Sequence, residues 1–310
     1  MKAHREEWVS YLRRQGYNSV EPLAAGMEGA VYRLGGGLVA KIWDDRSASD
    51  LAALQRFYAD LLLASLPFAT PEVIRILEAE GSAVTIEREL NGRPLRDYLD
   101  EGDNVAVPAA AGCVLSVLRG LGGVTAAQSA RDLPVLGANE PFRGGQSWPD
   151  AVRRLLDERT AAFGGQLSDA VPGFGILYAN LSTAISELAP PGSEFVIHGD
   201  ICGENILVDE DLNPLALLDW GFLSTAGDLA FDASVAAGIF NMYGSSAAEI
   251  DRQLRRLFEA ELGYPAELLI SYRAAYAVIT SNAYDPAGQD GHFAWCVRQL
   301  SSPEVRVVLG

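Results

Sequence analysis

Three short apolar runs, separated by polar turns, form the most regular pattern in the second half of the chain. They are residues 195–197, 206–208 and 215–218, and each contains Ile, Leu or Val. The polar stretch 198–205 follows the first run, and Asp219 follows the last. Short apolar runs bounded by turn residues are typical of strands. The pattern therefore predicts a strand, a polar loop and a β-hairpin, with a carboxylate where the last strand ends.

The first ninety residues predict a small antiparallel sheet with two helices. Residues 4–15 have apolar side chains at helical spacing, and residues 47–64 form a second helical segment that opens with the capping pair Ser47 and Asp50. Glycine-bearing turns separate the extended segments that surround these helices. The predicted strands are 20–24, 30–34, 38–43, 71–77 and 82–88.

The remaining chain predicts mostly helices around the apolar runs. A connection at 131–147 is rich in Pro, Gly and polar residues, and long connections often act as lids. The predicted helices are 106–121, 148–162, 174–189, 228–240, 246–262 and 265–282.

Three oxygen-bearing side chains accompany the short strands. Asp200 and Asn205 lie in the polar loop, and Asp219 follows the last run. The pattern brings all three to one end of a small sheet. A carboxylate can orient a hydroxyl and accept its proton, and carboxylate and amide oxygens are ligands for Mg²⁺. This combination is what phosphoryl transfer requires, and a turn that only caps itself would not also supply Asp219.

Length and composition indicate a two-lobe globular protein. The chain has 310 residues, of which 49% are hydrophobic, so it can bury a large core. It contains no apolar run of about 18 residues, which a membrane-spanning helix would need. The amino terminus has no apolar signal core, so we expect no export by a signal peptide. Three widely spaced cysteines favour reduced thiols in the cytoplasm.

The chain is strongly acidic. Its formal net charge is −17, from 41 acidic and 24 basic residues. This charge disfavours binding to nucleic acid and to anionic membrane surfaces, and it favours a cationic ligand. Nothing in the sequence indicates an obligate protein partner.

The polar loop resembles a known catalytic motif. His198, Asp200 and Asn205 have the His-x-Asp-x-x-x-x-Asn spacing of the protein-kinase catalytic loop. Asp219 begins Asp-Trp-Gly, which stands where kinases have Asp-Phe-Gly. The His-Gly-Asp and Asp-Trp spellings look like those of the aminoglycoside phosphotransferase and choline kinase family.

This resemblance covers nearly the whole chain and implies its fold class. We expect an α+β, protein-kinase-like two-lobe fold. Residues 1–90 would form a small, mainly antiparallel β lobe that binds nucleotide. Residues 91–310 would form a larger, mostly helical lobe with the catalytic loop and the acceptor site.

The resemblance also implies a nucleotide site in the first lobe. Lys41, in Val-Ala-Lys-Ile, stands where the family's lysine holds the α- and β-phosphates. The turn from Gly26 to Gly29 would cover the phosphates, since glycine lets backbone approach them closely. Kinases pair the lysine with a glutamate on the following helix, which here contains none. Asp60 and Gln55 are the candidates in its place.

Further contacts follow from the same resemblance. Adenine would meet the backbone of the crossover at 88–90, between Arg88 and Leu90. ATP, with GTP as a possible substitute, would bind between the lobes, and Mg²⁺ would bridge its phosphates to Asn205 and Asp219.

In the second lobe the resemblance assigns the acceptor chemistry. Asp200 would accept the acceptor's hydroxyl proton, and His198 would pack the loop and hydrogen-bond backbone. Asp232 would hold the loop by hydrogen bonds, and Asp228 would be the N-cap of the helix that contains Asp232. Six further carboxylates lie on segments that would form the wall of the acceptor site: Asp150, Asp157, Glu158, Glu261, Asp285 and Asp290.

The resemblance leaves the acceptor open. The acidic charge favours an aminoglycoside-type or other cationic antibiotic, which would make the protein a resistance kinase. A kinase of choline, homoserine or a sugar would use the same residues, and a silent nucleotide-binding module is a further alternative. A protein kinase is disfavoured because Asp228 and its helix follow within nine residues of Asp219, which leaves no room for an activation loop.

Overall fold

The computed structural model describes residues 6–310 except for 27–28, 45, 80–81, 101–105 and 139. The helices are α1 (Glu6–Arg14), α2 (Ala48–Leu63), α3 (Leu95–Asp100), α4 (Ala106–Gly122), α5 (Gln128–Arg131), α6 (Trp148–Ala170), α7 (Phe174–Ser186), α8 (Leu229–Ile239), α9 (Ala247–Leu262), α10 (Ala266–Thr280), α11 (Gly291–Leu300) and α12 (Pro303–Leu309). The strands are β1 (Glu21–Gly26), β2 (Gly29–Gly35), β3 (Leu38–Trp43), β4 (Val73–Ala79), β5 (Ser82–Arg88), β6 (Arg93–Pro94), β7 (Phe195–Ile197), β8 (Ile206–Val208), β9 (Pro214–Leu217) and β10 (Thr225–Gly227).

These elements form two compact units. The first comprises Met1–Pro94 and Ile206–Leu218, and the second comprises Leu95–Asn205 and Asp219–Gly310. The chain passes between the units at three points along the sequence. Two of these passages fall directly after Asn205 and directly before Asp219, so both predicted metal ligands are residues of the second unit.

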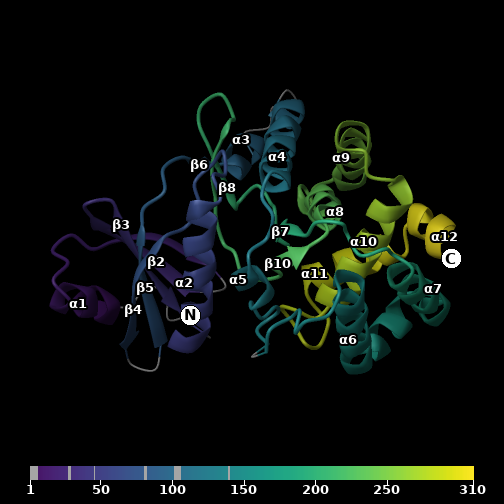
Figure 1. The fold of residues 1–310 in the computed structure, drawn as a ribbon, viewed down its shortest axis with the longest axis horizontal. Coiled ribbons are helices and arrows are strands. Elements are labelled where there is room, and N and C mark those ends of the chain that lie inside the picture. Colours follow the sequence, from purple (N-terminus) through teal and green to yellow (C-terminus); the bar gives the residue numbers. More distant parts are fainter. Residues whose placement is uncertain (1–5, 27–28, 45, 80–81, 101–105, 139) are drawn as a thin grey trace. The chain divides into compact units, whose positions relative to one another are not determined.

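The first unit is built on a five-stranded sheet with the order β1-β2-β3-β5-β4. Every neighbouring pair is antiparallel, which confirms the predicted antiparallel β lobe. Trp8 and Leu12 of α1 pack on one face of the sheet, against Tyr32, Ile42 and Val84. Helix α2 lies on the other side of the sheet (Figure 1).

Helix α2 begins with the capping pair that the sequence predicts. The carboxylate of Asp50 accepts a hydrogen bond from the N–H of Ser47 at 2.9 Å, and the Ser47 hydroxyl accepts one from the N–H of Asp50 at 3.3 Å. Such a cap typically stabilises a helix by about 1 kcal/mol. Leu51, Leu54 and Phe57 form the buried stripe of the helix.

The short strands around the polar loop form two small sheets, so the prediction of a single sheet was wrong. β7 pairs with β10, whereas β8 pairs with β9 and β6. β10 has only three residues and no long apolar run, so the sequence pattern does not reveal it as a strand. The strand that pairs with β7 is therefore β10, and not a strand of the β8–β9 hairpin. The β8–β9 hairpin itself is confirmed, with the Asp209 carboxylate accepting a hydrogen bond from the N–H of Asn213 at 2.8 Å.

The second unit is organised around two buried helices. All residues of α8 are buried, and α10 is buried from Leu269 to Thr280. α10 packs against α6, α8, α11 and α12 (Figure 1). A mostly helical second part of the chain is thereby confirmed.

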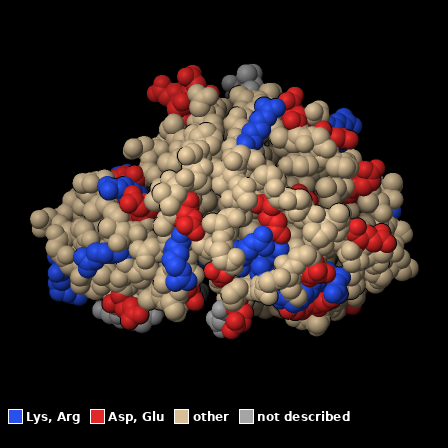
Figure 2. Space-filling model, in the orientation of Figure 1, with Lys and Arg blue, Asp and Glu red and all other residues tan. Residues whose placement is uncertain are grey.

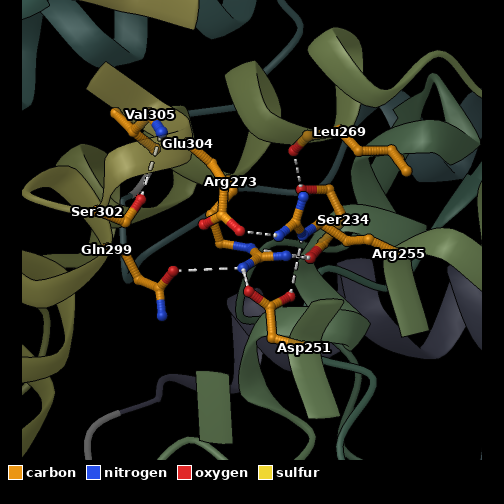
Figure 3. A network of polar contacts seen from close by, with 9 residues as sticks. All are labelled: Ser234, Asp251, Arg255, Leu269, Arg273, Gln299, Ser302, Glu304 and Val305. Atoms are coloured by element: carbon orange, nitrogen blue, oxygen red, sulfur yellow. Dashed lines mark hydrogen bonds and ion pairs between the residues drawn. The ribbon is translucent and has the colours of Figure 1, made fainter. Parts of the chain in front are cut away.

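A buried ion-pair network joins these helices. Arg273 on α10 is only 3% exposed, and its guanidinium donates to Asp251 on α9 at 2.6 Å and to the Ser234 carbonyl oxygen on α8 at 3.1 Å. The Arg255 guanidinium donates to Asp251 and also, at 3.2 Å, to Glu304 of α12, and Figure 3 shows both contacts. Removing one partner of a buried pair typically costs about 3–5 kcal/mol. The network therefore helps to fix α8, α9, α10 and α12 relative to one another.

The long connection before α6 is anchored by a second buried arginine. Arg143 is 1% exposed and pairs with Glu194 at 2.7 Å, and it also donates to the carbonyl oxygen of Ala226 on β10. Arg131 pairs with the same glutamate. The irregular connection is as predicted, and Arg143 anchors it to the second unit.

Two helical predictions were incomplete. α6 runs to Ala170, beyond the predicted end at residue 162, because Gly164 and Gly165 do not interrupt it. Gly164 is buried near Phe174 of α7, and such packing overrides the low helix propensity of glycine. The short C-terminal helices α11 and α12 were not predicted. Across the described part of the chain, no helix is both long and apolar enough to cross a membrane.

Candidate active site

The loop after β7 is built around a glycine. Gly199 has a φ of +79°, which L-residues rarely adopt. A Cβ at this position would lie 2.4 Å from the Cβ and 2.9 Å from the carbonyl oxygen of Leu223. The glycine between His198 and Asp200 therefore lets the segment after Asp219 pack directly against the loop.

A buried carboxylate holds the backbone of this loop. Asp232 on α8 is fully buried, and it accepts hydrogen bonds from the N–H groups of His198 and Gly199, both at 2.7 Å. Burial raises the pKa of Asp232 to about 7, while the two amide donors act in the opposite direction. The predicted hydrogen bonding of the loop by Asp232 is confirmed. Asp228 caps α8 as predicted, by accepting from the N–H of Ala230.

The side chain of His198 packs inside the loop. It is fully buried, and its ring lies 4.5 Å from that of Trp220, between ring centres. Its Nδ1 accepts a hydrogen bond from the N–H of Asp200 at 3.1 Å. A nitrogen that accepts a hydrogen bond carries no proton, so a neutral His198 has its proton on Nε2. This geometry suits the expected packing role better than proton transfer to an acceptor.

Asp200 and Asn205 meet at the other end of the loop. Nδ2 of Asn205 donates to the carbonyl oxygen of Asp200 at 2.9 Å and to its carboxylate at 3.2 Å. The amide nitrogen of Asn205 is used in this way, so its amide oxygen is not needed to hold Asp200. Asp200 itself is half-buried.

Asp219 adopts an unusual backbone conformation. Its φ is +53°, a left-handed value that costs a non-glycine residue about 1–2 kcal/mol and is found most often at functional sites. The Ser224 hydroxyl ties this segment to the loop: it accepts from the N–H of Gly221 at 2.8 Å and donates to the carbonyl oxygen of His198 at 2.9 Å. The sequence reasoning missed Ser224, since a serine in a turn carries no distinctive signal.

Asn205 and Asp219 offer the ligand chemistry that Mg²⁺ prefers. Magnesium usually binds one or two protein oxygens and completes its shell with water and phosphate oxygens. In the described ranges there is no group of three or more His, Cys, Asp or Glu side chains suited to a metal. This donor set fits a metal ion that is shared with a nucleotide.

Lys41 lies on the sheet face opposite to the core formed with α1. Its cross-strand neighbour is Thr85 on β5, and its Nζ lies 4.0 Å from the centre of the Trp43 ring. Thr85 donates to the buried carboxylate of Glu87 at 2.5 Å. Residues two apart in a strand share a face, so Glu87 lies on the lysine's face. The sequence reasoning missed Glu87, although two polar residues within an apolar strand were the available signal.

The two glycines of the β1–β2 hairpin differ in the space around their Cβ positions. Gly29 has a φ of +143°, and a Cβ there would lie 1.7 Å from the carbonyl oxygen of Ile42. Gly26, its partner across the hairpin, has open space around its Cβ position. Residues 27–28 of the predicted phosphate-covering turn lie outside the described residues.

The two α2 residues that could pair with Lys41, Gln55 and Asp60, differ in their contacts. Gln55 donates from Nε2 to the carbonyl oxygen of Val73 on β4 at 2.9 Å, so it serves the packing of the helix on the sheet. Asp60 is partly buried on the same helix and stays the predicted partner.

Two of the three residues in the crossover at 88–90 already use their backbone N–H groups within the protein. The N–H of Arg88 donates to the carbonyl oxygen of Glu72 at 3.1 Å, and that of Glu89 donates to Gly37 at 2.9 Å. The Arg88 side chain also pairs with Glu72. The contact of adenine with backbone groups from Arg88 to Leu90 stays a prediction, and two of the N–H groups in this stretch are already used within the protein.

The six carboxylates expected around the acceptor already have protein partners. Arginines pair with Asp157, Glu158 and Glu261. Backbone N–H groups donate hydrogen bonds to Asp285 and Asp290. A serine hydroxyl donates to Asp150. Local arginines and amides thus offset much of the negative charge that these residues contribute.

The antiparallel first unit, the helical second unit and the loop geometry define the class of protein: a two-unit, protein-kinase-like phosphotransferase fold. A family model described as "Phosphotransferase enzyme family" matches residues 19–269. The chain belongs to this phosphotransferase family. A search of the curated proteins found no match.

Solved structures with the same fold include several aminoglycoside phosphotransferases. One is aminoglycoside phosphotransferase APH(3'')-Id from Streptomyces rimosus in complex with ADP and streptomycin, which is 21% identical, with a TM-score of 0.57 over 88% of this chain and 97% of that one. The gentamicin complex of APH(2")-IIa is 14% identical, with a TM-score of 0.61 over 100% of both chains. The GDP and kanamycin complex of APH(2")-IIIa is 15% identical, with a TM-score of 0.63 over 95% of this chain and 98% of that one.

Proposed function

We propose that this protein transfers the γ-phosphoryl group of ATP, or of GTP, to a hydroxyl group of a small molecule. The observation that carries the proposal is the catalytic loop. Asn205 bridges the backbone and the carboxylate of Asp200, while Asp232 holds the loop from α8. A general base must sit at a fixed position near the proton that it accepts, and this loop provides such a carboxylate. Membership of the phosphotransferase family supports the same reaction.

In the proposed reaction, the acceptor oxygen forms a bond to the γ-phosphorus. The bond from that phosphorus to the oxygen bridging it to the β-phosphate breaks, and its electron pair leaves with ADP. Asp200 accepts the hydroxyl proton of the acceptor and later releases it to solvent. The products are a phosphate ester and ADP, and positioning and charge stabilisation supply most of the rate.

The residues proposed to hold the nucleotide are those that match the family's motifs. Lys41 would contact the α- and β-phosphates, the hairpin between Gly26 and Gly29 would cover them, and the backbone from Arg88 to Leu90 would contact adenine. Asn205 and Asp219 would hold Mg²⁺, which neutralises phosphate charge when it is bound.

We propose a cationic, aminoglycoside-type antibiotic as the acceptor, with antibiotic resistance as its consequence. The net charge of −17 supports a cationic ligand, and solved structures with this fold contain streptomycin, gentamicin or kanamycin. Choline, homoserine or a sugar is the alternative acceptor. A silent nucleotide-binding module is disfavoured because Lys41, Asp200 and Asp219 are all present. Free cysteines fit a cytoplasmic location.

The direct test is an acceptor panel. The purified protein is incubated with Mg²⁺ and ATP or GTP, together with each of several aminoglycosides, choline, homoserine and simple sugars. ADP or GDP release is followed, and the acceptor is analysed by mass spectrometry. We expect release that depends on one acceptor and the appearance of its phosphate ester. Nucleotide binding without transfer to any acceptor of the panel would contradict the proposed activity.

The metal assignment has its own test, which does not depend on turnover. Asp219→Ala should abolish Mg²⁺-dependent binding of ATP, because it removes the anionic ligand of the pair. Asp211→Ala, in the exposed β8–β9 turn, is the matched control and should bind as the wild type does. Tight, metal-independent ATP binding by Asp219→Ala would refute the assignment.

A further inference from the structure

A row of aromatic rings runs through the second unit, from the segment after Asp219 to α11. Phe222 stacks on Tyr284, with ring centres 5.7 Å apart and ring planes at 10°. Tyr284 packs edge-to-face on His292 at 4.9 Å. His292 in turn stacks on Trp295 at 5.6 Å. The row therefore connects the Asp219 segment with the helix that follows Tyr284 in the chain.

The same row lies near the proposed base. Tyr276 on α10 packs against His292 and Trp295, with ring centres 6.4 and 6.0 Å apart. Burial raises the pKa of the Tyr276 hydroxyl well above its usual range, and the negative charge of Asp200 raises it further. Phe222, at the other end of the row, directly precedes Leu223, which packs against Gly199 in the catalytic loop, so the row begins beside that loop.

Two tyrosines of this region expose their rings at its surface. Tyr284 is 40% exposed and Tyr243 is 66% exposed. A methyl group on Gly291, the first residue of α11, would lie 3.6 Å from the Tyr243 ring, while Tyr284 packs on the next residue, His292. The two exposed rings therefore flank the start of α11. Tyrosine combines a large apolar ring face with a polar hydroxyl, and it is enriched where proteins bind partners.

The carboxylates of this region are already engaged. Asp285 accepts from the N–H groups of Ala287 and Gln289, and Asp290 caps α11 by accepting from the N–H of Phe293. In the catalytic loop, Glu204 pairs with Arg96 at 2.9 Å. Recognition of an acceptor here can thus draw on ring faces and not only on carboxylates.

We infer that Tyr284 and Tyr243 are specificity-determining residues that receive an aminated sugar ring of the acceptor on their faces. One face of a sugar ring presents C–H bonds that pack well on an aromatic ring. An ammonium group on the same sugar adds a cation–π attraction to the ring face. The inference rests on the proposed function and names the chemistry that selects its acceptor.

The test compares Tyr284→Ala and Tyr243→Ala with the wild type, using kanamycin and streptomycin as probes and saturating Mg·ATP. KM is measured by turnover, and the Kd of each probe is measured by calorimetry, which needs no turnover. Loss of a ring face should raise the KM and Kd of the better probe about tenfold, a factor equivalent to 1.4 kcal/mol. Because the rings are not part of the phosphoryl-transfer machinery, kcat should stay within about threefold.

Two further variants separate recognition from a structural effect. Tyr284→Phe keeps the ring face and should behave as the wild type does. Tyr11→Ala removes a tyrosine that likewise packs on an aromatic ring, that of Trp8, with ring centres 5.8 Å apart, but on α1 in the first unit. This control should leave KM and Kd unchanged.

The outcomes distinguish this inference from the proposed function. Intact transfer with unchanged KM and Kd in both alanine variants would overturn the inference and leave the phosphotransferase assignment in place. Wild-type protein that binds neither probe would refute the aminated-sugar class. Transfer to no acceptor of the wider panel would contradict the proposed function itself.

Discussion

At the scale of residues, the position of Asp200 depends on groups that act through the backbone. Asp232 fixes the two amides that precede Asp200, and Ser224 ties the same stretch to the Asp219 segment. When the Asp232 carboxylate is ionised, its two hydrogen bonds are charge-assisted, and such bonds are about twice as strong as neutral ones. The carboxylate is thereby placed before any substrate binds, which reduces the cost of reaching the reactive geometry.

A buried histidine makes the stability of the second unit depend on pH. Burial lowers the pKa of His292 from 6.5 to about 4, while the charge of Asp290 acts against this shift. The unfolded chain therefore takes up the proton first as pH falls. The stabilisation is complete above pH 6.5 and is lost between about pH 6.5 and 4, by up to about 3 kcal/mol.

His292→Gln should weaken this pH dependence while keeping a polar group opposite Thr280. Urea unfolding at pH 7.5 and pH 5 measures the loss for each protein. We expect the wild type to lose clearly more stability than the variant does between these two values. Equal losses would mean that His292 does not titrate abnormally.

The sequence predicted some of these residues and not others, for a physical reason. Asp200, Asn205 and Asp219 stand at spacings that a loop and a hairpin impose, so a linear pattern reveals them. Ser224 acts through a contact with His198, which is 26 residues away in the sequence, and a linear pattern holds no record of such a contact. Glu87 left a weak signal, since it and Thr85 are two polar residues within an apolar strand. The phosphate-binding role of Lys41 stays a prediction.

At the scale of elements, the first hairpin depends on one of its two glycines. A side chain at position 29 would overlap the carbonyl oxygen of Ile42, whereas position 26 has open space around it. Gly29→Ala should therefore destabilise the protein by about 1–3 kcal/mol, and Gly26→Ala should change stability by less than about 0.5 kcal/mol. Urea unfolding of both variants checks the difference. Similar stabilities for the two would contradict this account of the hairpin.

The elements themselves divide into those that local pattern determines and those that packing determines. β3 and β5 match their predicted bounds, because alternation and turns suffice to define them. α6 and β10 do not: the first continues through two glycines, of which Gly164 packs near Phe174 of α7, and the second is a strand only because β7 lies beside it. Tertiary context overrides weak local preference in both cases.

At the scale of the whole molecule, the acidic charge is spread and locally compensated. On the face shown in Figure 2, acidic and basic side chains lie mostly in mixed groups. Many of these are ion pairs, such as Arg153 with Asp157 and Arg119 with Glu261. Exposed pairs of this kind contribute little to stability, so the net charge bears on the attraction of ligands more than on folding.

The net charge of −17 predicts a salt-dependent capture of a cationic acceptor. Salt screens attraction beyond about 8–10 Å, so KM for a polycationic acceptor should rise between roughly 50 and 500 mM salt. KM for Mg·ATP should change less over the same range, and the part of acceptor binding that ring faces supply should be insensitive to salt. Titrations of both substrates at several salt concentrations check this. A salt-insensitive KM for the best acceptor would reject a cationic acceptor held by charge.

The measurement that tests the central claim most directly is a comparison of turnover and nucleotide binding in Asp200→Asn. The substitution keeps the size of the side chain and removes its ability to accept a proton. We predict that kcat falls by about 100-fold or more, while the Kd of Mg·ATP stays within about threefold of the wild-type value. Turnover within about threefold of wild type, with binding intact, would show that Asp200 is not the base that accepts the acceptor's proton.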